Sequence, residues 1–171
     1  MDADEWEVLE LAGAYLFDIS LVPIAWYEAE PKPVQLARSD DHTVLDTWWK
    51  KHAPDIPARE YFDGCLTRDV ESTQIEDLVE TVWVDENHHR VELWESKAGD
   101  VAHLDLHIDA RYAYMDFLGS IVEFATKEKC MFFFYSEEVF VEAASVTVFE
   151  ALNRSPAAAL ARGEGSYSGT H

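Results

Sequence analysis

Three runs of alternating residues lie in the stretch LVETVWVDENHHRVELWESKAGDVAHLDLHID, residues 78–109. Successive side chains of a β-strand point to opposite faces of the sheet, so each run would give one apolar and one polar face. The connecting segments ENHH and KAGD are short, and Gly99 suits a tight hairpin. The stretch therefore predicts an antiparallel meander with strands at 78–85, 90–96 and 101–109.

The chain after the meander carries alternating helix and strand patterns. Apolar residues recur at helical spacing over 113–130, with charges near the ends that match the helix dipole. The run CMFFFYS, residues 130–136, is almost wholly apolar, as a buried central strand would be. A helix over about 143–153 follows, and then a small Ala-rich helix that Ser155 would cap and that ends at Gly163.

These elements predict a single α+β domain, residues 1–163, in which helices pack on one face of an antiparallel sheet. Residues 164–171 form a polar tail that we expect to be flexible. No internal repeat or Pro-rich linker divides the chain.

The N-terminal third leaves more than one interpretation open. The segment EWEVLEL, residues 5–11, alternates imperfectly, and a helix over 4–14 fits almost as well. Residues 17–27 have a strand-like composition, and Pro23 within them implies an edge position or a bulge.

Two further segments have helical signatures. Residues 43–52 are typical of a short helix that Pro54 would close. The segment Thr73-Gln74-Ile75-Glu76 has the form of a capping box, which leaves a short helix open as an alternative to strand structure before the meander.

Charge is the strongest global feature of the sequence. The chain has 34 Asp and Glu against 13 Lys and Arg, a formal net charge of −21. Binding to nucleic acid phosphates or to anionic membranes requires a basic surface, so both are excluded as expected functions. The charge exceeds the roughly 2–8 units that keep a small domain in solution. Residues 1–31 and 69–89 contain no Lys or Arg, and a cationic partner would offset their mutual repulsion.

The two cysteines, Cys65 and Cys130, form no CxxC pair. The N-terminus is acidic and lacks the apolar core of a secretory signal, and no window approaches 18 apolar residues. We therefore expect a cytoplasmic protein with reduced thiols and no membrane segment.

The polar face of the last meander strand is the one candidate for metal chemistry. In HLDLHIDAR, residues 103–111, the side chains of His103, Asp105 and His107 would share a face and could converge on one ion. No His-Glu-x-x-His helix supplies a further ligand, although His88-His89 could contribute from the neighbouring turn. We favour a solvated strand face that contacts a partner, and expect no cofactor.

Other signatures of catalysis are absent. The sequence has no Gly-rich dinucleotide fingerprint, no phosphate-binding P-loop and no Gly-x-Ser-x-Gly nucleophile motif. Carboxylate pairs are abundant, but at this acid content any two would meet by chance. The expectation is therefore that the protein is not an enzyme, with a metal-dependent hydrolase as the minority alternative.

The C-terminal half resembles, in layout, small bacterial immunity proteins that neutralise toxic effectors of interbacterial secretion systems. The resemblance rests on HLDLHIDAR–YMDFLGSIVEFATKEKC–MFFFYS–FEALNRSPAAALARG, over roughly residues 100–163. It is a similarity of pattern and composition without a diagnostic motif, so it assigns no role to any single residue. It implies a binding protein that occludes a toxin or effector.

Charge and resemblance together predict an acidic inhibitory protein of the immunity or antitoxin type with a basic protein partner. The expected contact residues are acids of the two cation-free segments and of the polar strand face, with two aromatic anchors: Asp2, Asp4, Glu5, Glu7, Glu10, Asp69, Glu71, Glu76, Asp77, Glu80, Asp85, Glu86, Asp105, Asp109, Trp83 and Trp94. Alternatives are a nucleic-acid mimic of the anti-restriction or anti-CRISPR type, the metal-dependent enzyme, and an oligomeric accessory protein such as a homodimer.

Overall fold

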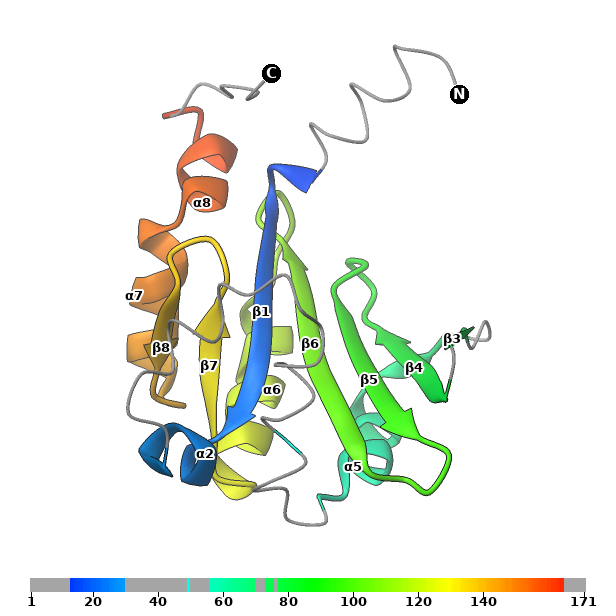
Figure 1. The fold of residues 1–171 in the computed structure, drawn as a ribbon. Coiled ribbons are helices and arrows are strands. Elements are labelled where there is room, and N and C mark those ends of the chain that lie inside the picture. The colour runs from blue at the N-terminus through cyan, green and yellow to red at the C-terminus, as the bar shows by residue number, and fades with distance from the viewer. Residues whose placement is uncertain (1–12, 30–48, 50–55, 70–72, 76, 165–171) are drawn as a thin grey trace.

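The computed structural model describes residues 13–29, 49, 56–69, 73–75 and 77–164. Figure 1 shows how the helices and strands of this part of the chain are arranged. Their bounds are β1 (Leu16–Pro23), α2 (Ile24–Ala29), α5 (Ala58–Cys65), β2 (Thr67–Arg68), β3 (Gln74–Ile75), β4 (Leu78–Val84), β5 (Arg90–Ser96), β6 (Val101–Asp109), α6 (Met115–Lys127), β7 (Cys130–Phe134), β8 (Val139–Val141), α7 (Ser145–Arg154) and α8 (Pro156–Ala161).

The strands form one antiparallel sheet in the order β2-β4-β5-β6-β1-β7-β8, and β3 also pairs with β4. The predicted meander is confirmed as β4, β5 and β6. Its second turn contains Gly99 at φ +91°, a backbone conformation that glycine adopts without strain. The predicted single α+β domain is thus confirmed for the described residues.

The position of Pro23 corrects the sequence-based expectation. β1 lies in the centre of the sheet, between β6 and β7, rather than at an edge. Pro23 is the last residue of β1, where it pairs with Cys130, and the chain then turns into α2 instead of continuing as a strand to residue 27. A proline is tolerated there because the strand ends, and the next N–H, of Ile24, donates to the carbonyl of Lys129 at 3.0 Å.

The capping-box helix that the sequence left open as an alternative at 73–76 is not formed at the described residues 73–75. Gln74 and Ile75 pair with Val79 and Leu78 as β3, so strand pairing determines their backbone in place of the local capping pattern. The alternatives at 5–11 and 4–14 and the tail at 165–171 lie outside the described residues. The helix predicted at 43–52 does too, except for Trp49, which is buried in the core.

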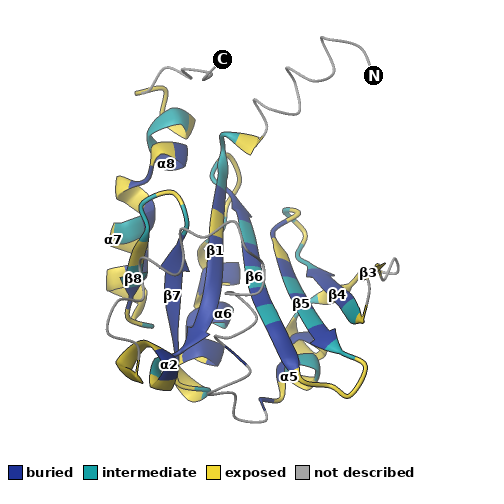
Figure 2. Cartoon of the chain, viewed as in Figure 1, coloured by how far each residue is buried: buried dark blue, intermediate teal, exposed yellow. Residues whose placement is uncertain are grey.

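The apolar face of the sheet is covered by helices, as predicted. Leu104, Leu106 and Ile108 of β6 are fully buried, and Figure 1 shows α6 behind the sheet, next to β1 and β6. Phe62 of α5 packs against Phe124 of α6 with ring centroids 4.9 Å apart. Figure 2 shows the resulting alternation of buried and partly buried positions along β5 and β6.

The C-terminal predictions are confirmed. All five residues of β7 are buried, as the CMFFF run indicated. Ser155 caps α8, because its Oγ accepts from the N–H of Ala158 at 3.2 Å.

Cys65 is exposed and Cys130 buried, and both are free thiols. Within the described segments, no helix is both long and apolar enough to cross a bilayer.

Candidate functional site

The polar side chains of β6 meet polar side chains of β1 and β5 on the sheet face opposite α6. His107 lies between two carboxylates: its Nδ1 is 2.8 Å from Oδ1 of Asp18, and its Nε2 is 3.3 Å from Oε2 of Glu92. Glu92 also forms an ion pair with Arg90 at 2.6 Å. The strand register causes this arrangement, since Asp18 and Arg90 are the two cross-strand neighbours of His107.

These contacts fix the charge of His107. Burial alone would lower the pKa of His107, but the hydrogen bonds and the charges of Asp18 and Glu92 outweigh burial and raise it to about 10. The imidazole is therefore a cation at neutral pH and donates from both nitrogens. Neither nitrogen has a lone pair to offer a metal ion.

A second set of polar contacts surrounds Asp105. The Ser20 hydroxyl donates to Oδ1 of Asp105, and the Tyr135 hydroxyl lies 2.7 Å from Ser20 Oγ. Because the single proton of Ser20 is used on Asp105, Tyr135 donates to Ser20. Burial raises the pKa of Asp105 despite the hydrogen bond from Ser20. Ser20, which joins the other two residues, is only 3% exposed.

The row His103, Asp105, His107 does share one strand face, as predicted, but not as an open ligand set. Among the described residues, no group of three or more His, Cys, Asp or Glu is arranged to hold a metal ion. The face is also less solvated than expected, because its three members are partly buried, and Asp105 and His107 are bonded to neighbouring strands.

Asp109 and His89 hold the end of β6 through hydrogen bonds within the chain. Asp109 is buried, and hydrogen bonds from Arg111 outweigh this burial and lower its pKa. His89 is fully buried: its Nδ1 accepts from the N–H of Asp109 at 3.2 Å, so the proton is on Nε2, which donates to the carbonyl of Ala113 at 2.8 Å. His89 therefore cannot join the metal row considered from the sequence.

The structure distributes the other predicted contact residues over several environments. Trp83 is 0% exposed and donates to Asp63 at 2.9 Å, so it is a core residue and not a surface anchor. Trp94 is partly exposed on β5. Glu80 is buried on β4, and this burial raises the pKa of its carboxyl group. The acids Asp69, Asp77 and Glu86 are exposed. Outside the described residues lie Asp2, Asp4, Glu5, Glu7, Glu10, Glu71 and Glu76.

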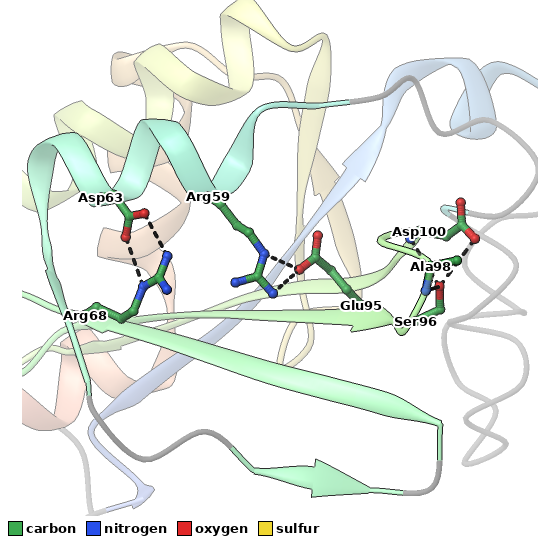
Figure 3. A network of polar contacts seen from close by, with 7 residues as sticks. All are labelled: Arg59, Asp63, Arg68, Glu95, Ser96, Ala98 and Asp100. Atoms are coloured by element: carbon green, nitrogen blue, oxygen red, sulfur yellow. Dashed lines mark hydrogen bonds and ion pairs between the residues drawn. The ribbon is translucent and has the colours of Figure 1, made fainter.

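Most Lys and Arg side chains of the described segments are held by carboxylates of the same chain. Figure 3 shows two examples, Arg59 with Glu95 and Arg68 with Asp63, in which α5 contacts the sheet. The pairs within these segments are Arg59–Glu95, Arg68–Asp63, Arg90–Glu92, Lys97–Asp77, Arg111–Asp109, Arg154–Glu150 and Arg162–Glu164. Among the described residues few cations are left to neutralise the other exposed acids, so this part of the surface is negative.

One groove of about 410 Å³ combines this charge with apolar walls. It lies between the end of α5, β2, the β4–β5 turn and the start of α6, all of which contribute lining residues. Its apolar lining comes from Leu66, Val84, Met115 and Phe117. Its acidic lining comes from Asp85, Glu86 and Asp116, and no Lys or Arg of the described residues lines it.

Sequence reasoning selected Asp85 and Glu86 but missed Asp116, which is 30 positions further along the chain and joins them only through the fold.

No protein-family model, curated protein or solved structure matches this chain. The function is therefore argued from the charge and geometry of the chain itself.

Proposed function

We propose that this protein is an inhibitory binding protein of the immunity or antitoxin type, which acts in the cytoplasm by covering a basic protein partner. The observation that carries the proposal is that most Lys and Arg of the described segments pair with acids of the same chain, which leaves a surplus of exposed carboxylates there. The proposal includes no catalytic step and no cofactor. Inhibition would be steric, through coverage of a toxin or effector surface.

The physical basis is electrostatic complementarity. A net charge of −21 attracts a basic protein from a distance and increases the rate of productive encounters. Exposed acids such as Asp69 and Glu86 would then face Lys and Arg on the partner. Because salt screens such attraction beyond roughly 10 Å, the association rate should fall as ionic strength rises.

The test has two steps. The immobilised full chain is exposed to lysate of its source organism, and a single basic protein retained at near-stoichiometric yield is purified and assayed for its own activity with and without this protein. Inhibition at a one-to-one ratio is the expected result. Capture without inhibition, or no capture of a basic protein, would contradict the proposal.

The same assay separates the nucleic-acid mimic from the immunity-type inhibitor. A mimic must occupy the partner's DNA or RNA site, so added nucleic acid would displace it in competition. An inhibitor that covers another surface would stay bound when nucleic acid is added.

A further inference from the structure

We propose that the groove between α5, β2, the β4–β5 turn and α6 receives one long cationic side chain, Arg or Lys, of the basic partner. This inference rests on the proposed function and assigns it a specific place on the molecule. Three properties of the groove lead to it: its apolar walls, its uncompensated carboxylates and its rigidity.

The apolar walls fit the stem of such a side chain. Lys and Arg carry three or four methylene groups that prefer apolar surroundings, while the charged end stays polar. Phe117 forms a buried part of the wall, and Met115, at 54% exposure, is an unusually accessible apolar residue beside it. An unbranched Met side chain can adjust its shape to an inserted stem.

The carboxylates fit the charged end. Glu86 is exposed in the β4–β5 turn, and Asp116 is exposed in the first turn of α6. Within the described segments neither carboxylate forms an ion pair. By contrast, several other acids of these segments are paired with an Arg or Lys. The start of α6 has a partial positive charge of roughly half a unit that would oppose a cation, but it is smaller than the combined negative charge of Glu86 and Asp116. The balance favours a guanidinium or ammonium group.

The groove is also fixed before any partner arrives. Oδ1 of Asp85 accepts from the backbone N–H groups of Asn87 and His89, at 2.9 and 2.8 Å. The side chains of Asn87 and His89 both contact the carbonyl of Ala113, at 3.1 and 2.8 Å. These bonds connect the β4–β5 turn to the segment before α6, so two walls of the groove are joined. Little ordering is then needed on binding, which favours affinity.

The test uses NMR amide shifts of the full chain with three blocked tripeptides, acetyl-Gly-X-Gly-amide, in which X is Arg, Lys or citrulline. Citrulline has the shape of Arg without its charge. We expect the Arg or Lys peptide to shift the amides of groove residues, among them Thr67, Asn87 and Ser120, and the citrulline peptide to leave them unchanged. Equal shifts with citrulline, or no localised shifts, would overturn the inference.

Paired variants separate the groove from the overall charge. Glu86→Gln combined with Asp116→Asn should weaken binding of the cationic peptide by about three- to tenfold. The control Glu28→Gln combined with Glu142→Gln removes the same charge from exposed positions on α2 and after β8, and should weaken it by less than about twofold. Equal losses in both variants would mean that the peptide senses only net charge, and the groove assignment would be wrong.

The inference and the proposed function can fail separately. If a captured basic partner is inhibited equally by wild type and by the groove variant, the groove inference fails and the proposed function stands. If no basic partner is captured, the proposed function fails, whatever the peptide experiment gives. Unchanged thermal unfolding of both variants is the control for folding.

Discussion

The stability of the fold should depend on the proton of His107. Its pKa rises from 6.5 to about 10 because the hydrogen bonds and charges of Asp18 and Glu92 outweigh the effect of burial. The folded state therefore holds this proton more tightly than the unfolded state. The contribution is fully present below pH 6.5 and is lost as the pH rises through the folded pKa.

The magnitude follows from the pKa and from exposure. A pKa raised from 6.5 to about 10 corresponds to roughly 4–5 kcal/mol if the charges interact without screening. The side chain of Asp18 is 51% exposed, however, and solvent weakens its part of the interaction. We therefore expect about 2 kcal/mol of pH-dependent stability from His107.

The assay is urea unfolding at several pH values between 6.5 and about 9, the range below the ordinary thiol pKa. His107→Gln removes the titrating group and keeps an amide that donates to a carboxylate. The free energy of unfolding of this variant should lie below that of wild type at pH 6.5, and the gap should narrow as the pH rises. A control variant, His88→Gln in the exposed β4–β5 turn, should run parallel to wild type. A constant gap for His107→Gln would refute the reasoning.

Three other interactions give separate predictions. Ser20→Ala should lower the free energy of unfolding by about 1–3 kcal/mol, because it leaves buried Asp105 without its donor. Tyr135→Phe should lower it less, because the Ser20–Asp105 bond remains. Equal losses for the two variants in urea unfolding would contradict this. Ser155→Ala should cost about 1 kcal/mol, because the N–H of Ala158 loses its cap; an unchanged thermal midpoint would count against the cap. Ellman's reagent should label exposed Cys65 in the native protein and reach Cys130 only on unfolding, because burial raises the pKa of Cys130 to about 12; rapid labelling of both thiols would exclude this environment.

The sequence was sufficient for the elements whose patterns are local. The meander, α6, β7 and the Ser155 cap each combine a clear periodicity with matching turn or cap residues. The edge position predicted from Pro23 was wrong because strand order is not a local property of the sequence. The partners of β1, which are β6 and β7, lie far along the chain. Nothing within residues 17–27 shows that both edges of this strand will be paired.

The polar networks depended on the same long-range pairing. Asp18 and Ser20 alternate with apolar residues, and this pattern could have marked them as one polar face of a strand. That they meet His107 and Asp105 depends on the register between strands 85 or more positions apart. The groove likewise collects side chains from α5, β4 and α6, so its acidic character could not be derived from any single motif.

Association kinetics with the captured partner are the most direct test of the central claim that carboxylate charge drives binding. The comparison is between wild type and the double variant Asp69→Lys, Glu86→Lys, two exposed acids that form no ion pair within the described surface, over a series of salt concentrations. We predict that the variant associates at least about tenfold more slowly at low salt and shows a flatter salt dependence, with folding unchanged by circular dichroism. An association rate and salt dependence equal to those of wild type would contradict the claim.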